Sequence, residues 1–229
     1  MKTPNVDQET AMKTPETPTA EIIREYGPFP GADSVNGLSY DGQHIWVAVG
    51  EQLHAVDPAS GTTRRSIDVA AQAGTAYDGQ YLFQTSGDRI QKIDPQTGQV
   101  LATIPTPAGD DCSGLAWAEG SLWVGQYQDR KIHQVDPQTG EVLRTIESNR
   151  YVTGVTWVDG QLWHATWDDD GSELRHIDPG TGQVLESLHM PAGTHVSGLE
   201  SDGGDLFYCG GGNSGKVRVV RRPAARSPR

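Results

Sequence analysis

Residues 114–146 read GLAWAEGSLWVGQYQDRKIHQVDPQTGEVLRTI, and this stretch decides the fold because its pattern recurs along the chain. It holds four short apolar runs with the periodicity of β-strands, separated by turn signals. A Glu-Gly pair follows the first run, and an Asp-Pro-x-x-Gly turn precedes the fourth. Four short strands in about 40 residues are typical of one blade of a β-propeller.

Equivalent units occur five times in the 229 residues. Their first glycines are 37, 40, 40 and 44 residues apart: Gly37, Gly74, Gly114, Gly154 and Gly198. The last unit stops before its fourth strand, whereas residues 21–26 (EIIREY) match that strand without belonging to any unit. We therefore predict an all-β fold, a five-bladed β-propeller of four-stranded antiparallel blades, closed by an N-terminal outer strand that leaves no unpaired edge. A dimer with exchanged terminal strands is the alternative.

The two ends of the chain differ from the repeats. Residues 1–20 lack apolar periodicity, which predicts a disordered tail. Residues 223–229 hold Arg226 and Arg229 and no acid, which predicts a basic C-terminal tail. The expected organisation is therefore one propeller domain over 21–222 between two tails.

Composition excludes several classes of partner. The formal net charge of −12 argues against nucleic acid and anionic membranes, and no run approaches the ~20 apolar residues of a membrane span. No apolar stretch follows Lys2, so this form shows no secretory signal. We therefore expect a cytoplasmic protein or assign no location. His and Cys show no spacing typical of metal ligands, so we expect no metal and no cofactor. We expect a monomer.

Alignment of the five units separates structural positions from candidate functional ones. Large side chains that repeat at one register predict packing between blades rather than a ligand platform. They form two columns, one in the second strand (Trp46, Leu82, Trp123, Trp163 and Phe207) and one in the first (Tyr40, Tyr77, Trp117 and Trp157). A functional residue is instead expected to break its column.

The loops that lead into the first strand of each blade, here called the lead-in loops, vary most in chemistry. Propeller ligands usually bind at one end of the central channel, where these loops meet those between the second and third strands. Three positions before the repeat glycine stand an acid, a phenol and an imidazole: Asp111, Tyr151 and His195. Together they predict a shared site that orients a polar substrate or moves protons. The alternative is that they are loop residues in water.

Two further positions break their columns. Glu200 is the carboxylate in a column of small residues, and it is either a general base or the partner of an Arg. His164 interrupts an apolar column, either as a ligand-binding residue or as a hydrogen-bonded core histidine. The predicted catalytic residues are Asp111, His195 and Glu200, and the predicted substrate-binding residues are Asn36, Tyr127, Arg150, Tyr151, His164 and Trp167.

The unit Gly-Leu-x-Trp with its later Asp-Pro-x-Thr-Gly-x-Val-Leu resembles that of the glutamine cyclotransferase-like β-propellers, over about residues 21–222. That family includes the plant-type glutaminyl cyclases and their bacterial relatives. The unit is similar, more loosely, to streptogramin lyase-like and YncE-like propellers, which usually have seven blades. The resemblance implies five blades and the conversion of N-terminal glutaminyl residues to pyroglutamyl with loss of ammonia.

Two motifs of that family meet changed residues here. The family's Thr-Gln-Gly-Leu corresponds to residues 35–38 (VNGL), with Asn36 in place of the Gln. Its Tyr-Glu-Ser-Thr-Gly corresponds to residues 46–50 (WVAVG), so Val47 replaces the Glu that is thought to shuttle protons. We therefore expect little or no cyclisation of N-terminal glutamine.

Two functional classes remain for a small molecule or peptide bound at the channel mouth. One is a small-molecule enzyme on this scaffold, with cyclase or lyase chemistry that depends on proton transfer. The other is a non-enzymatic propeller that binds a peptide or protein partner. The two differ in whether the predicted residues converge around a closed pocket.

Overall fold

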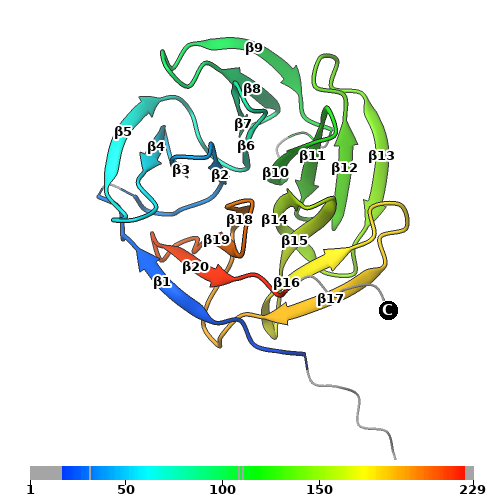
Figure 1. The fold of residues 1–229 in the computed structure, drawn as a ribbon. Coiled ribbons are helices and arrows are strands. Elements are labelled where there is room, and N and C mark those ends of the chain that lie inside the picture. Colours follow the sequence, from blue (N-terminus) through cyan, green and yellow to red (C-terminus); the bar gives the residue numbers. More distant parts are fainter. Residues whose placement is uncertain (1–16, 31, 108, 110, 225–229) are drawn as a thin grey trace, which may run out of the picture.

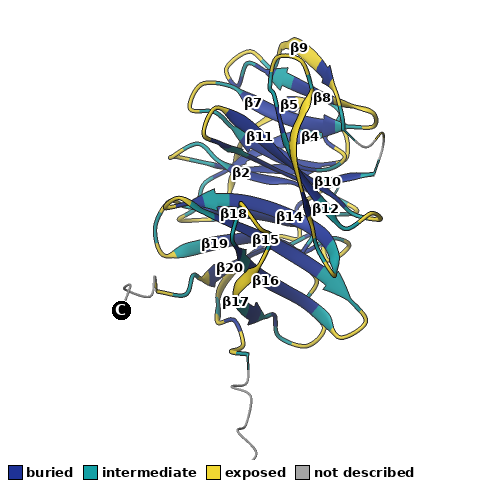
Figure 2. Cartoon of the chain, turned by 90° about the vertical axis from the view of Figure 1, so that its right-hand side faces the viewer, coloured by how far each residue is buried: buried dark blue, intermediate teal, exposed yellow. Residues whose placement is uncertain are grey.

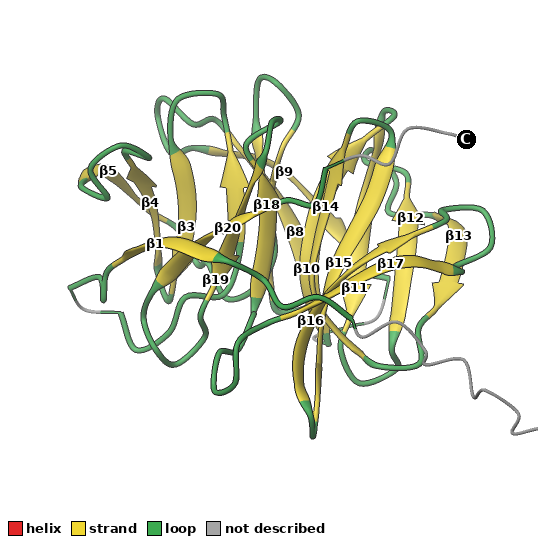
Figure 3. Cartoon of the chain, turned by 60° about the horizontal axis from the view of Figure 1, so that its bottom comes forward, coloured by secondary structure: helices red, strands yellow, loops and turns green. Residues whose placement is uncertain are grey.

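A computed structural model describes residues 17–30, 32–107, 109 and 111–224. The regular structure of these residues is all β (Figure 3), and they include no helix that could span a membrane. Five four-stranded antiparallel sheets surround a central axis, as Figure 1 shows. The predicted five-bladed propeller is confirmed.

Each blade runs from an innermost strand at the axis to an outermost strand at the rim. The first blade contains β2 (Leu38–Tyr40), β3 (Ile45–Val49), β4 (Gln52–Val56) and β5 (Thr63–Asp68). The second contains β6 (Thr75–Tyr77), β7 (Leu82–Ser86), β8 (Arg89–Ile93) and β9 (Val100–Pro105). The third contains β10 (Cys112–Ala118), β11 (Ser121–Gln126), β12 (Lys131–Val135) and β13 (Val142–Glu147). The fourth contains β14 (Tyr151–Val158), β15 (Gln161–Asp168), β16 (Gly171–Ile177) and β17 (Val184–His189).

The fifth blade joins the two ends of the chain. Its order is β18 (Gly198–Ser201), β19 (Leu206–Gly210), β20 (Val217–Arg221) and then β1 (Ile22–Tyr26). Strand β1 pairs antiparallel with β20, with Tyr26 opposite Val217. The predicted closure by an N-terminal outer strand is therefore confirmed, and it occurs within one chain.

The packed chain begins slightly before the predicted domain boundary at residue 21. Thr19 forms an isolated bridge with His189 at the end of β17, and the Ala20 amide donates to the His189 carbonyl at 2.7 Å. Ala20 is only 5% exposed, because it packs between the fourth and fifth blades. Residues 1–16 of the predicted N-terminal tail and residues 225–229 of the predicted basic tail lie outside the described residues.

The Asp-Pro-x-x-Gly turns owe their sequence to hydrogen bonding. In the third blade, Asp136 Oδ1 accepts from the amides of Gln138 at 2.9 Å and Thr139 at 2.8 Å. These bonds, that from Thr139 first, lower the pKa of Asp136, and Gly140 adopts the left-handed φ of 78° that the turn requires. The same carboxylate role recurs at Asp57, Asp94 and Asp178.

The glycine that opens each repeat is needed for close approach at the axis. A Cβ on Gly154 would lie 2.4 Å from the Leu199 amide nitrogen of the next blade, and one on Gly114 would lie 2.5 Å from that of Val155. Real Cβ atoms do not come so near to backbone. The innermost strands of neighbouring blades therefore meet backbone to backbone at this level.

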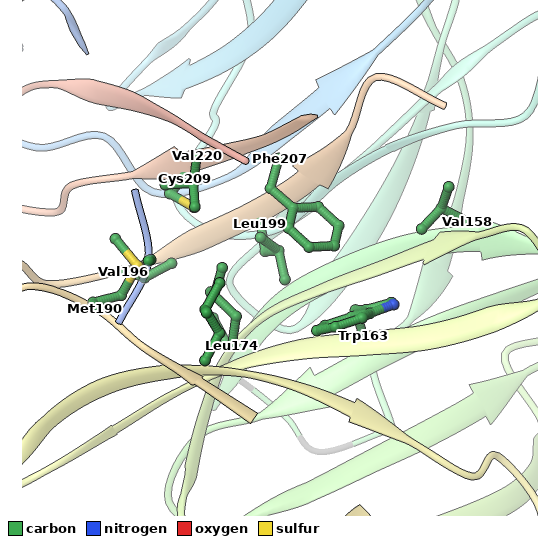
Figure 4. Close-up of a cluster of buried hydrophobic side chains, with 12 residues drawn as sticks. Val158, Trp163, Leu174, Met190, Val196, Leu199, Phe207, Cys209 and Val220 are labelled. Carbon is green, nitrogen blue, oxygen red and sulfur yellow. The ribbon is translucent and has the colours of Figure 1, made fainter. Parts of the chain in front are cut away.

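The large side chains of the second-strand column fill the interfaces between blades, as predicted. Those of the first-strand column (Tyr40, Tyr77, Trp117 and Trp157) are only partly buried. Figure 4 shows the cluster between the fourth and fifth blades, where Trp163 tilts against Phe207 at 5.1 Å between ring centroids. Trp46, Leu82 and Trp123 are likewise buried in the equivalent interfaces. Figure 2 shows the same division, with buried strands inside and exposed residues along loops and outer strands.

Candidate functional site

A pocket of about 360 Å³ opens at the end of the channel where the lead-in loops lie. We call it the lead-in pocket, and its principal lining residues are Tyr127, Thr153, Trp167, His195, Asn213 and Arg218. Tyr127 follows β11, Thr153 and Trp167 lie within β14 and β15, and His195 precedes β18. Asn213 lies in the loop between β19 and β20, and Arg218 lies within β20. The volume lies within the range of sites for small molecules.

The aromatic wall of this pocket is built from stacked pairs. The rings of Trp167 and His195 stack with centroids 3.9 Å apart, so the indole fixes the orientation of the imidazole. Tyr127 stacks on Tyr151 at 4.8 Å, and the Arg130 guanidinium lies 4.3 Å from the Tyr151 centroid. Tyr151 thus supports Tyr127 without lining the pocket itself.

The cation of the pocket is Arg218 on β20, whose side chain is 9% exposed. Its Nε donates to Glu25 Oε1 of β1 at 2.9 Å, and its Nη1 donates to the His195 carbonyl at 3.5 Å. A hydrogen bond from Lys216 and, after it, that from Arg218 lower the pKa of Glu25. Strand β1 therefore supplies the carboxylate of Glu25, which pairs with Arg218 in the pocket.

The loop between β19 and β20 passes closely over this guanidinium. A Cβ on Gly211 would lie 2.7 Å from Arg218 Nη1 and 2.3 Å from Ser214 Oγ. Only a glycine leaves room for both groups at this point. Sequence reasoning missed Arg218 and Asn213, because the repeat alignment has no turn or column that marks this loop.

The residue before the repeat glycine carries a hydroxyl group in three blades. Two of these hydroxyls bond the next blade, and the third lies at the pocket. Ser113 Oγ donates to the Val152 carbonyl of the next blade at 2.7 Å, and Ser197 Oγ bonds the Val35 carbonyl in the same way. Thr153 is buried at the pocket, and its hydroxyl has no hydrogen-bond partner among the described residues. Asn36, predicted to bind substrate, does not line this pocket.

Asp111 lies beside the pocket and not in it. Its Oδ2 accepts from the Gln128 amide at 2.8 Å, and its carbonyl accepts from the Tyr127 amide at 3.0 Å. The carboxylate thus fixes the turn that follows β11. Of the predicted cluster of Asp111, Tyr151 and His195, His195 lines the pocket, whereas Asp111 and Tyr151 contact Tyr127, which also lines it.

Arg150 belongs to an ion-pair network on the fourth blade. Its guanidinium pairs with Asp170 and with Glu173 Oε1, the latter at 3.3 Å. Glu173 also accepts from Arg175 Nε at 2.6 Å. These contacts hold the β15–β16 turn against the lead-in loop, so the predicted role of Arg150 in substrate binding has no support from its position.

His164 is a core residue. It is 1% exposed within β15, and burial, with the nearby Arg175 charge second, lowers its pKa to about 3. The ring is therefore neutral at physiological pH and does not reach the lead-in pocket. The burial of His164 agrees with a core position, but its Nδ1 has no hydrogen-bond partner among the described residues.

Glu200 lies at the other end of the channel from His195. It lines a second pocket of about 260 Å³. We call this the hairpin pocket, because the β18–β19 turn and its equivalents surround it. Its principal lining residues are Tyr40, Tyr77, Trp117, Trp157, Glu200 and Asp202. Burial raises the pKa of Glu200 to about 7. The three predicted catalytic residues therefore occupy three separate places.

Comparison with known proteins bears on the fold. Residues 59–151 match the family described as Repeat of unknown function (DUF6923), and no curated protein matches the chain. The crystal structure of a glutaminyl cyclase from Myxococcus xanthus is similar with a TM-score of 0.73 and 16% identity, covering 89% of this chain and 96% of that one. The fold is that of a glutaminyl cyclase-like propeller. A chain of a mitotic checkpoint complex is similar with a TM-score of 0.57 and 13% identity, covering 96% of both chains.

Val47, which corresponds to the glutamate of the glutamine cyclotransferase-like family, lines neither pocket. Val47 on β3 is fully buried among Val35, Leu38 and Tyr208. A carboxylate there would lie in an apolar core without access to either pocket. Its column therefore serves packing in this chain.

Proposed function

We propose that the protein is a small-molecule enzyme of the cyclase or lyase class, with proton transfer to a substrate held in the lead-in pocket. The observation that carries this proposal is the position of His195. Its ring stacks on Trp167 at 3.9 Å, and its nitrogens make no hydrogen bond to the described residues. An imidazole that is held in place but unpaired is suited to general acid or base catalysis.

The remaining groups of the pocket have separable roles in this proposal. Arg218 provides a buried positive charge, which favours a substrate with a carboxylate or another electron-rich oxygen. Tyr127 and Trp167 provide ring surface for the apolar part of the substrate. The Thr153 hydroxyl, which has no partner among the described residues, is available to a third polar group. The likeness to a glutaminyl cyclase supports this scaffold as one that can carry an enzyme.

Cyclisation of N-terminal glutamine is not the activity that we propose. Val47 stands in an apolar cluster, and no carboxylate is among the described residues that line the lead-in pocket. We expect peptides that begin with glutamine to remain uncyclised, with turnover well below about 1 s⁻¹. Mass spectrometry of such peptides after incubation measures the loss of ammonia directly, and turnover at enzymatic rates would overturn this expectation.

The second candidate is a non-enzymatic propeller that binds the end of a peptide. It is favoured by the engagement of Asp111 in the turn after β11, because this leaves the pocket with binding groups and one titratable base. In this case Arg218 would take the C-terminal carboxylate and Trp167 an apolar side chain. A chain of a mitotic checkpoint complex has a similar fold, which supports this class as a use of the architecture.

A dipeptide library distinguishes the two candidates. Dipeptides that stabilise the protein in thermal-shift assays are incubated with it, and mass spectrometry follows loss of water or ammonia. The enzyme proposal expects turnover that His195→Ala lowers at least 100-fold with little change in binding, while Arg218→Gln weakens binding. Binding without turnover would favour the second candidate. Turnover that survives in His195→Ala would refute the assigned role of His195.

A further inference from the structure

The hairpin pocket, at the opposite end of the channel, has a chemistry that the proposed function does not use. Four of the five innermost strands in Figure 1 each contribute one aromatic side chain to it: Tyr40 from β2, Tyr77 from β6, Trp117 from β10 and Trp157 from β14. Neighbouring blades hold the two indoles, since Trp117 stacks on Phe83 at 5.4 Å and Trp157 on Trp123 at 5.5 Å. The walls of the pocket are therefore rigid before any ligand arrives.

The fifth blade has Ser201 at the position of the aromatic residue, and an acid stands on each side of it. Glu200 Oε1 accepts from the Thr156 hydroxyl at 2.6 Å and from the Ser201 amide at 2.8 Å, which fixes the carboxylate at the pocket. Asp202 follows two residues later and also lines the pocket. No Arg contacts Glu200 among the described residues, so the alternative of an Arg-paired Glu200 does not apply.

The surroundings of the pocket are negative. Its described lining includes no Lys, Arg or His. A carboxylate also begins the hairpin between the first and second strands of every blade: Asp41, Asp78, Glu119, Asp159 and Asp202. Turn geometry explains several of them, because Asp41 accepts from the His44 amide and Asp202 from the Leu206 amide. Asp41, Asp78 and Asp159 also pair with His44, Lys92 and Arg222. The negative charge that attracts cations toward this end of the channel therefore comes mainly from Glu119, Asp202 and Glu200, which form no ion pair among the described residues.

We propose that the hairpin pocket binds a small organic ammonium ion, with Glu200 as its counter-charge and the four aromatic side chains as its walls. Aromatic rings attract organic cations through their π faces, and they do so most strongly where water is excluded. A carboxylate in the wall of such a pocket selects a cation over a neutral molecule of the same shape. This site is independent of the function proposed for the lead-in pocket, since the two pockets share no lining residue.

Binding at this site depends on pH. The titratable groups that face Glu200 are Asp202 on its own turn, Tyr40 and Asp41 from the first blade, and Tyr77 from the second. The third and fourth blades contribute only the indoles of Trp117 and Trp157. None of these groups is cationic, and burial keeps the pKa of Glu200 near 7. An ammonium ion binds the ionised form, so affinity rises as the pH rises through neutrality.

The test is calorimetric titration of the full chain with choline, ethanolamine and the neutral carbon isostere of choline, dimethylbutanol. We expect saturable binding of choline at pH 8, at least tenfold weaker binding of the isostere, and at least tenfold weaker choline binding at pH 5.5. Ethanolamine separates the two contributions, because a primary ammonium relies more on the carboxylate and a quaternary one more on the rings. Glu200→Gln should weaken choline binding at least tenfold at pH 8, whereas Glu141→Gln, an exposed change of the same charge, should not.

Each result supports or overturns the proposal. Failure of choline to saturate the protein below about 10 mM, equal affinity for the isostere, or unchanged binding in a folded Glu200→Gln would each refute it. If Glu200→Gln does not fold, Asp202→Asn and the pH profile of the unaltered protein decide the question. Loss of choline binding on lowering the pH, with no loss of folded structure by circular dichroism, would then support the site. Failure here leaves the dipeptide experiment unaffected, because that experiment reports on His195.

Discussion

Removal of the closing strand tests how the ring is held together. A chain that begins at residue 28 lacks β1 and with it the pairing to β20. Tyr26 is 6% exposed, and burial of such a side chain contributes about 2–3 kcal/mol. The loss of Glu25 leaves the guanidinium of Arg218 buried without its carboxylate, which costs about 1–3 kcal/mol more. We expect the free energy of unfolding to fall by roughly 3–6 kcal/mol, a large part of the 5–15 kcal/mol typical of a domain.

Urea denaturation followed by tryptophan fluorescence and circular dichroism measures this change. A control chain that begins at residue 17 keeps Thr19, Ala20 and β1, and we expect its stability to lie within about 0.5 kcal/mol of the full chain. Tyr26→Ala should account for about half of the loss. Equal denaturation midpoints for the chains that begin at residues 17 and 28 would refute the reasoning, because the fifth blade would then be stable with three strands.

Three further predictions concern Gly154 at the axis, Asp136 in its turn and the carboxyl group of Glu200. Gly154→Ala places a Cβ 2.4 Å from backbone of the next blade and should cost about 2 kcal/mol or more in urea denaturation, whereas Gly204→Ala, with its nearest atom at 3.4 Å, should cost under about 1 kcal/mol. Asp136→Ala removes the carboxylate that orders its turn and should lower the Tm by about 2–4 °C in scanning calorimetry without altering ligand binding; an unchanged Tm would contradict that role. The pKa of Glu200 is raised from 4.5 to about 7, so the folded chain holds an extra proton between these values and loses stability as the pH rises through them. The stability of Glu200→Gln relative to the unaltered protein should therefore improve by about 3 kcal/mol between pH 4 and pH 8, and parallel pH profiles would show that Glu200 is not buried as described.

The arrangement of the pockets was only partly predictable from the sequence. The sequence indicated His195, Trp167 and Tyr127 as candidates, and all three line the lead-in pocket. It also indicated Asp111 and Arg150 from the lead-in loops, and their contacts hold loops in place. A candidate position therefore marks a local requirement, and whether the requirement is structural or functional depends on partners far away in the chain.

The sequence by itself determined the number of blades, the four strands of each blade, the turns and the closing strand. These features are local or repeated: a turn needs its Asp and Gly within five residues, and a fivefold pattern admits one circular arrangement. Tertiary structure alone decided which end of the channel each side chain reaches. Glu200 and His195 are five residues apart, yet the repeat glycine between them, Gly198, lies where the innermost strands meet at the axis, so the two side chains serve different pockets. The pairing of Glu25 with Arg218 was likewise decided by ring closure, because it joins residues 193 positions apart through a contact that no local pattern records.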